Sequence, residues 1–346
     1  MSVIEGKRAK EHFKQYALTW WEPQSFFTYD AMLCSAFYGM RDKWNYREEY
    51  NIPKDFLLIA DSGGFEQATQ GIRIEPIDVL KWQENNADIA FTLDVPPVNP
   101  ENLKFTDDMN YFKKCADQSI RNAECAQKNR DNIKLYSVLQ GHTKEQLDIW
   151  SQKKLTEYDG TALSHKSTHL VWLSVQAMYA KEQGVQNIHV LTGTGYNSVP
   201  IIVYLRKHFK QVTFDSSSYG MGARNMQYNL PYRYHLFFGR AYNEKVKTLP
   251  CDCPICQAIS IEDLQTGTSI SGALISLHNL YNYIQHVNFL DAIVDDEELF
   301  SNYIKRHTNE KTQRAYNFLT SCEKIGFDDT YTKFFPDKHA RLMEMF

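Results

Sequence analysis

The feature that most constrains the fold is a repeating pattern of short apolar, β-rich runs, each followed by a polar residue or glycine and then by a helix-like segment. Six such runs can be identified, at residues 56–60, 89–93, 133–139, around 158, 188–191 and 211–214. Their spacing of about 25 to 50 residues leaves room for a crossover helix between consecutive strands. Strands that alternate with helices in this way predict a parallel sheet.

Residues 1–50 are harder to interpret, apart from a helix that we expect around Ala31 to Met40. With one or two strands there, the count approaches that of a closed β/α barrel, in which catalytic groups stand at the carboxyl ends of the strands. An open doubly wound sheet expects a phosphate-binding glycine loop near its first strand, and Gly193-Thr-Gly195 is too short and too late for one. We therefore predict an α/β fold, a (β/α)8 TIM-like barrel, with residues 1–346 forming one domain.

The composition is that of an ordinary globular protein in a reducing compartment. The 346 residues are 43% hydrophobic, enough for a substantial core. The net charge of -4 argues against a basic coat over the whole surface, although a local patch could still bind nucleic acid. The seven cysteines do not resemble a disulfide framework, and no apolar run is long enough for a signal peptide or a membrane span. We therefore expect a cytoplasmic protein without a membrane partner.

Two of the strand ends carry aspartates that suit acid and nucleophile roles. Asp61 precedes Ser-Gly-Gly, where a ligand can approach closely and burial would raise the pKa of the carboxyl group. Asp215 is followed by three serines, whose hydroxyls would keep it ionised. One protonated and one ionised carboxyl group suit glycosidic chemistry. Both residues could equally be helix N-caps, and the spacing alone does not decide between these interpretations.

Two further strand ends carry polar residues that suit recognition of a base. Asp94 is followed by Val-Pro-Pro, an extended segment in which helix capping is a poorer explanation. Gln140 ends the next apolar run. In a barrel, Asp94 and Gln140 could present acceptors and donors to the edge of a purine.

Residues 221–250 combine basic and aromatic side chains. Five basic residues face a single acid, Glu244, which gives a local charge of 5 - 1 = +4; they are Arg224, Arg233, Arg240, Lys245 and Lys247. Six aromatic residues are interleaved with them. This mixture is typical of a nucleic-acid groove with stacking platforms, and it is also compatible with an ordinary packed segment. Its position between Asp215 and the cysteine cluster favours binding.

Three cysteines lie within six residues, at Cys251, Cys253 and Cys256. His278 follows in a stretch with the apolar spacing of a helix. Three thiolates and one imidazole make a closed tetrahedral zinc site, which is structural because no position remains for water. The alternative is a reduced loop with a core histidine, but the spacing favours zinc. We place a zinc-binding subdomain at about 230–290 and a helical C-terminal segment at about 291–346.

Taken together, these motifs resemble the tRNA-guanine transglycosylase superfamily, zinc-containing β/α barrels that exchange a guanine in nucleic acid for a 7-deazaguanine. The resemblance covers about Phe56 to Tyr283. It implies that Asp215 is the nucleophile and Asp61 the general acid and base. It also implies base-binding roles for Ser62, Phe65, Asp94, Gln140, Gly141 and Gly160, a substrate-strand contact for Arg224, and the zinc ligands Cys251, Cys253, Cys256 and His278.

The implied reaction has two steps. Asp215 attacks the anomeric carbon and expels guanine, which takes a proton from Asp61. The incoming 7-deazaguanine then loses a proton to Asp61 and attacks the covalent intermediate, so that configuration is retained. The target base must first leave its stack. The resemblance also suggests a homodimer through the zinc region.

Several positions depart from the tRNA enzymes. Glu66 replaces a glutamine, Val95-Pro96 replace an acid and a cysteine, and Thr192 replaces a methionine. Met221 replaces an arginine, and Gly160-Thr-Ala-Leu replaces a Gly-Gly-Leu-Ala wall.

These departures favour the DNA-modifying branch, the deoxypurine-in-DNA enzymes (DpdA) of phages and bacterial islands. We therefore expect DNA as the polymer and a base such as 7-cyano-7-deazaguanine, in the host cytoplasm if the protein is phage-encoded. The alternatives are tRNA as the substrate and a non-catalytic, zinc-dependent nucleic-acid-binding subunit.

Overall fold

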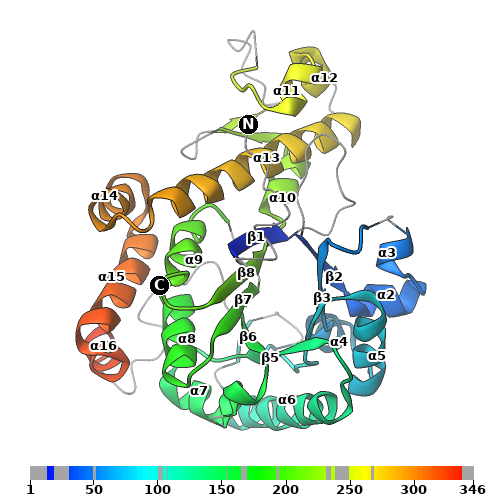
Figure 1. Cartoon of the computed structure of the whole chain (residues 1–346), viewed down its shortest axis with the longest axis vertical. Helices are drawn as coiled ribbons and strands as arrows, with labels where there is room; N and C mark the ends of the chain where they lie inside the picture. The colour runs from blue at the N-terminus through cyan, green and yellow to red at the C-terminus, as the bar shows by residue number, and fades with distance from the viewer. Residues whose placement is uncertain are drawn as a thin grey trace.

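The computed structural model describes eleven stretches of the chain, and every structural statement below refers to them. They are residues 31–49, 52–99, 104–106, 108–152, 154–164, 170–191, 195–230, 249–265 and 269–336, together with the backbone of 14–18 and 235–237. Eight strands in these stretches form one sheet, wrapped into a nearly closed barrel with helices outside it (Figure 1).

All neighbouring strands of the barrel are parallel. Their order is β1-β8-β7-β6-β5-β4-β3-β2, and the two end strands β1 and β2 lie beside each other. The strands are β1 (Lys14–Leu18), β2 (Ala31–Ser35), β3 (Leu57–Asp61), β4 (Ile89–Phe91), β5 (Lys134–Leu139), β6 (Gly160–Ser164), β7 (Asn187–Leu191) and β8 (Gln211–Asp215). The predicted barrel is confirmed.

The helix that we expected around Ala31 to Met40 is wrong in its first half. Ala31–Ser35 forms β2, and α2 begins only at Ala36. All five residues of β2 are buried, because the strand lies between the barrel interior and the outer helices. A short apolar run of this kind lacks the alternation of a half-exposed strand and cannot be distinguished from a buried helix by periodicity.

Helices cover the outside of the barrel in the order that the connections require. They are α2 (Ala36–Asp42), α3 (Tyr46–Glu49), α4 (Gly64–Gln70), α5 (Pro76–Asn86), α6 (Met109–Asn129), α7 (Lys144–Ser151), α8 (Leu170–Glu182), α9 (Val199–Leu205) and α10 (Ser218–Arg224). Side-chain caps begin two of them: Asp108 accepts hydrogen bonds from Asn110 and Tyr111, and Thr143 forms a capping box with Gln146.

The chain beyond β8 forms a hairpin and a set of helices. The hairpin strands β9 (Gln227–Asn229) and β10 (His235–Phe237) are antiparallel. The helices are α11 (Pro254–Ala258), α12 (Ile261–Gln265), α13 (Ser269–Ile293), α14 (Glu297–His307), α15 (Glu310–Ile325) and α16 (Phe327–Phe334). In Figure 1, α13 runs from the α11 and α12 end to the α14 end, and α15 and α16 descend beside α8. The predicted helical C-terminus is confirmed for the described residues up to 336; the last residues of the predicted segment, 337–346, lie outside them.

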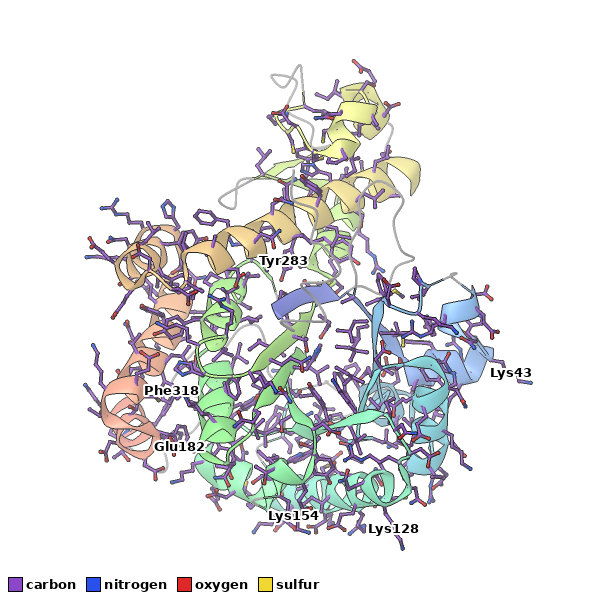
Figure 2. The ribbon with its side chains drawn as sticks, viewed as in Figure 1. Lys43, Lys128, Lys154, Glu182, Tyr283 and Phe318 are labelled. Atoms are coloured by element: carbon purple, nitrogen blue, oxygen red, sulfur yellow. The ribbon has the colours of Figure 1, made fainter. Side chains whose placement is uncertain are left out.

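Apolar side chains join the outer helices to the barrel. Figure 2 shows Lys43 and Lys128 at the outer edge of the molecule, whereas Tyr283 and Phe318 lie between layers. Tyr283 and Phe318 are fully buried, and they belong to the core cluster that also contains α8 and α9. None of the described helices has the length and apolarity needed to cross a membrane.

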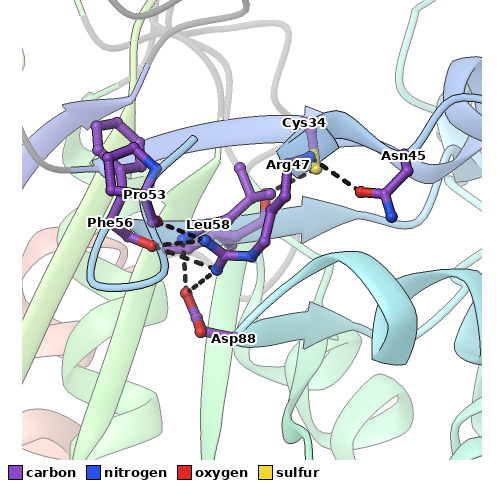
Figure 3. A network of polar contacts seen from close by, with 8 residues as sticks. Cys34, Asn45, Arg47, Pro53, Phe56, Leu58 and Asp88 are labelled. Carbon is purple, nitrogen blue, oxygen red and sulfur yellow. Dashed lines mark hydrogen bonds and ion pairs between the residues drawn. The ribbon is translucent and has the colours of Figure 1, made fainter. Parts of the chain in front are cut away.

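Arg47 of α3 ties together the amino ends of two strands (Figure 3). Its guanidinium donates to the carbonyl oxygens of Pro53 and Phe56, at 3.0 and 3.3 Å, and to Asp88 Oδ2 at 2.8 Å. The same Asp88 oxygen accepts a hydrogen bond from the Leu58 amide at 2.8 Å. The network therefore closes the barrel at the end opposite to the aspartates that follow the strands.

We expect Arg47→Ala to lower the free energy of unfolding by about 1–2 kcal/mol, because several carbonyl and carboxylate acceptors lose their charged donor. Urea unfolding of the purified protein measures this. Arg41→Ala is the matched control: Arg41 is exposed, and its partners are Asp42 and the ring of Tyr38, both on its own helix α2, so its loss should cost much less than that of Arg47. Equal costs for the two variants would contradict the role assigned to Arg47.

Candidate active site

The two predicted catalytic aspartates lie at the same end of the barrel. Asp61 is the last residue of β3, and Asp215 is the last residue of β8. Asp94 and Gln140 follow β4 and β5 at that end. Parallel strands bring their carboxyl ends to one rim, so residues far apart in the sequence gather there.

The Asp61 carboxyl group is held in an environment that favours its protonated form. Burial, followed by the negative charges of Glu66 and Asp94, raises its pKa to about 8. The Gly63 amide donates a hydrogen bond to Asp61 Oδ2 at 3.3 Å. This hydrogen bond lowers the pKa of Asp61 and so offsets part of the rise. At neutral pH this carboxyl group can therefore donate a proton, as a general acid requires.

Asp94 and Gln140 form a buried pair beside it. Gln140 Nε2 donates to Asp94 Oδ2 at 2.9 Å. Burial raises the pKa of Asp94 to about 6, and the hydrogen bond from Gln140 partly offsets that rise. Gly64 is required next to this pair, because a Cβ atom there would lie 2.6 Å from Asp94 Oδ1 and 2.3 Å from its carbonyl oxygen.

Gly141 lies in a backbone conformation that favours glycine, with φ at 129°. Its carbonyl oxygen accepts a hydrogen bond from Gln176 Nε2 at 2.7 Å, and the same nitrogen donates to the Ser164 carbonyl at 2.8 Å. Gln176 of α8 thus fixes the chain at the ends of β5 and β6. Gln176 is fully buried among apolar neighbours of its helix. A single glutamine in an apolar helix was the signal in the sequence that could have identified this residue, and the sequence interpretation missed it.

Ser62 and Phe65 occupy different environments in the segment after β3. Ser62 is fully buried, and its Oγ has no hydrogen-bond partner among the described residues. Phe65 is 50% exposed, although it is a large apolar side chain. Its exposed ring is therefore accessible to a planar ligand.

The structure does not bring Gly160 to this rim. Gly160 is the first residue of β6, and the rim end of that strand is Ser164. A Cβ atom at Gly160 would lie 2.6 Å from the Tyr136 ring, so the packing of the barrel interior explains this glycine. We expected the strand to end near Gly160, but β6 begins there. The predicted contact between Gly160 and the base is therefore wrong.

The nucleic-acid-binding residues are described only in part. Arg224 ends α10, the helix that follows Asp215, and it is exposed. Arg233 and Arg240 lie outside the described residues, as does Thr192. Met221 of the same helix is 55% exposed.

His189 is a neighbour of Asp215 that the sequence interpretation missed. It lies in β7 with no exposed surface, and its Nε2 is 3.2 Å from Asp215 Oδ1. A histidine within an apolar strand was the available signal, but its neighbour on β8 could not be identified before the register was known. The two strands pair His189 with Thr213.

The predicted metal ligands come together from α11, the segment just before it, and α13. The three cysteine sulfur atoms and a ring nitrogen of His278 lie within 4.8 Å of one another. His278 Nδ1 is 3.3 Å from Cys256 Sγ and 3.4 Å from Cys253 Sγ. This Cys251, Cys253, Cys256 and His278 cluster could hold a metal ion, and its donor set suits zinc.

The surroundings of His278 orient it for this role. Its Nε2 lies 2.7 Å from the carbonyl oxygen of Asn229 and donates to it, which leaves Nδ1 directed at the sulfur atoms. The ring of Tyr228 stacks on the imidazole with centroids 3.5 Å apart. Asn279, the next residue, donates to the carbonyls of Tyr219 and Gln227 and therefore joins α13 to α10 and β9.

Comparison with known proteins identifies relatives of this arrangement. The family model for queuine tRNA-ribosyltransferase matches residues 60–311, which is well over half of the chain. A tRNA-guanine(15) transglycosylase of Sulfolobus acidocaldarius is 25% identical over 88% of this chain and 59% of its own length. Proteins of the same name from Methanosarcina mazei and Haloferax volcanii are 24% and 26% identical over 71% of this chain.

The matched regions cover 49% and 47% of those two proteins. The chain thus spans about half the length of the curated relatives that it matches.

Proposed function

The chain belongs to the queuine tRNA-ribosyltransferase family, and from that premise we propose that it is a guanine transglycosylase, a pentosyltransferase that exchanges a guanine base in a nucleic acid. The observation that carries the proposal is the pair of aspartates at the rim. Asp61 has its pKa raised to about 8, and Asp215 is close enough for its charge to contribute to that rise. A protonated carboxyl group near a second aspartate suits a retaining exchange at an anomeric carbon.

The first step forms a covalent intermediate. A carboxylate oxygen of Asp215 attacks the anomeric carbon of the target nucleotide, and the bond from that carbon to guanine breaks. The departing guanine takes the proton of Asp61 and leaves as a neutral base.

The second step restores the enzyme. The incoming guanine-like base gives its ring N–H proton to the Asp61 carboxylate and attacks the same carbon from the side that guanine left. The ester bond to Asp215 breaks, and its electron pair returns to the carboxylate. Two inversions give retention, and no nucleotide triphosphate is consumed.

The base pocket lies between the ends of β3, β4 and β5. Asp94 and Gln140 hold the hydrogen-bonding edge of the base, since they are buried and already oriented by their mutual hydrogen bond. Phe65 stacks on the face of the base with its exposed ring. A 7-deazaguanine presents the same edge as guanine, and we propose one as the incoming base.

From the sequence departures we expected DNA as the polymer. The names of the relatives instead favour tRNA. DNA stays a second candidate because of Met221. This exposed side chain stands where the resemblance places an arginine of the tRNA enzymes, so one phosphate contact is missing from the rim.

Incorporation of labelled guanine and of labelled 7-cyano-7-deazaguanine tests the function and the polymer together. The purified protein is incubated with tRNA, with double-stranded DNA and with single-stranded DNA. We expect label in tRNA. Label in DNA alone would establish the second candidate, and no label in any polymer would contradict the proposed function.

The cysteine and histidine cluster would hold a structural zinc ion. Zinc bound by three thiolates and one imidazole has no open position, so it supplies rigidity and no reaction step. Its position on α13, whose Asn279 contacts α10, connects it mechanically to the segment that follows Asp215.

The charge of Glu66 should set the alkaline limit of activity. The first step needs protonated Asp61, so kcat/KM for the nucleic acid should fall as the pH rises through about 8. After burial, Glu66 is the largest cause of the raised pKa of Asp61. Glu66→Gln removes that charge, the pKa of Asp61 falls, and the alkaline limb should move to lower pH by about one unit.

A pH profile of base exchange measures this shift. Glu75→Gln removes the same charge from an exposed position outside the pocket, so its profile should match that of the wild type. An alkaline limb that is identical in Glu66→Gln and wild type would show that Glu66 does not act on the catalytic acid.

A further inference from the structure

His189 lies in the barrel interior directly beside the Asp215 carboxylate. Its Nε2 is 3.2 Å from Asp215 Oδ1, and its Nδ1 is 2.9 Å from Thr213 Oγ1. The imidazole has no exposed surface, and its ring centroid lies 4.8 Å from that of Phe91 on β4. Both ring nitrogens are thus partnered, by two residues of the neighbouring strand β8.

The partners determine which nitrogen carries a proton. An ionised Asp215 can only accept a hydrogen bond, so Nε2 must carry a hydrogen that points toward Oδ1. The Thr213 hydroxyl can satisfy Nδ1 in either state of the ring. It donates to Nδ1 of a neutral imidazole, or accepts from Nδ1 of an imidazolium and turns toward the Ile188 carbonyl 3.5 Å away.

We propose that His189 is a positioning residue for the nucleophile, donating its Nε2 hydrogen to Asp215 so that the carboxylate is fixed in rotation and its negative charge is stabilised. This inference rests on the proposed function. In the first step the hydrogen bond holds the attacking carboxylate in one orientation toward the anomeric carbon. In the second step it stabilises the same carboxylate as the leaving group, because the charge that reappears on Asp215 meets a donor that is already in place.

The barrel itself keeps this donor in position. His189 and Thr213 are paired residues of adjacent strands, so the sheet fixes the backbone that carries the imidazole, and the contact of Nδ1 with the Thr213 hydroxyl restrains the ring. The Phe91 ring limits its rotation from the other side. A donor held in this way costs no reorganisation during the reaction.

Two substitutions at position 189 separate the donor from the volume of the side chain. His189→Gln retains an N–H donor at similar reach, whereas His189→Leu removes the donor and fills the space. We expect His189→Leu to lower kcat of base exchange by about 10- to 100-fold, the loss typical for one hydrogen bond to a charged group, with KM for the free base unchanged. His189→Gln should stay within about 5-fold of the wild type.

Tyr136→Phe is the matched control. Tyr136 is also fully buried in the barrel, and its hydroxyl donates to Gln211 Oε1 at 3.0 Å, near the amino ends of the strands. It should lose thermal stability but keep kcat. Equal kcat values for His189→Leu and wild type would overturn the inference, as would equal losses in the leucine and glutamine variants.

Nitrogen-15 NMR of histidine-labelled protein provides a readout that does not depend on activity. The His189 signals are assigned as those missing from His189→Gln. We expect Nε2 to carry a proton; a ring protonated only at Nδ1 would overturn the inference. If the wild type exchanges no base, the proposed function fails; if it does and His189→Leu is unimpaired, only the inference fails.

Discussion

Replacing Asp215 with alanine should reduce base exchange by at least about 10⁴-fold, because the covalent intermediate loses its nucleophile. The change leaves the buried Nε2 of His189 without its partner, which costs some stability, but Phe214 beside it remains in the core. The fold and the affinity for nucleic acid should therefore be preserved. Label incorporation under saturating substrate measures the loss.

Asp159→Ala is the control for this variant. Asp159 is also an aspartate next to a barrel strand, but it precedes β6 and pairs with Arg130 at the amino end of the sheet. It should lose stability and keep kcat. Exchange retained in Asp215→Ala would show that the nucleophile is another residue, and Asp61 would be the first to consider.

Loss of the cysteine and histidine cluster should have the largest effect on stability. Cys253→Ser, or removal of zinc by a strong chelator, should lower Tm by more than about 10 °C, because metal binding is coupled to folding in sites of this type. The cluster joins α11 to α13 and contacts β9 through Tyr228 and Asn229, and Cys253 is buried within it. Differential scanning calorimetry measures Tm, and elemental analysis of the same sample measures its zinc content.

Cys125→Ser is the corresponding control, since Cys125 is a partly exposed free cysteine of α6. Its zinc content and Tm should equal those of the wild type. A Cys253→Ser variant with unchanged Tm would contradict a structural metal. A wild-type protein that contains no zinc and resists the chelator would do so as well.

The positions of the two aspartates that we propose as catalytic were predictable because strand ends in a parallel barrel share one rim. Asp61 and Asp215 follow apolar runs, and the structure places both at that rim. The cysteine spacing likewise predicted the metal cluster, because three of its four ligands, Cys251, Cys253 and Cys256, lie within six residues of the sequence. In both cases the sequence pattern contains the physical constraint itself.

Other parts of the fold and the site could not be predicted, because they depend on strand boundaries and on contacts between neighbouring elements. β2 was taken for a helix because a short buried run has no distinguishing period. Gly160 was assigned to the wrong end of β6, since a weak apolar run gives no direction for its boundary. His189 and Gln176 were missed because their partners lie on neighbouring elements and depend on the register of the sheet.

The proposed mechanism requires that Asp215 forms a covalent bond with the nucleic acid. The most direct test is to incubate the wild type with the polymer that accepts label, without free base and with expelled guanine removed, and then to digest and map the adduct by mass spectrometry. We predict a nucleic-acid adduct on the peptide that contains Asp215, absent from Asp215→Ala. An adduct on any other residue of a protein that is active in exchange would show that Asp215 is not the nucleophile.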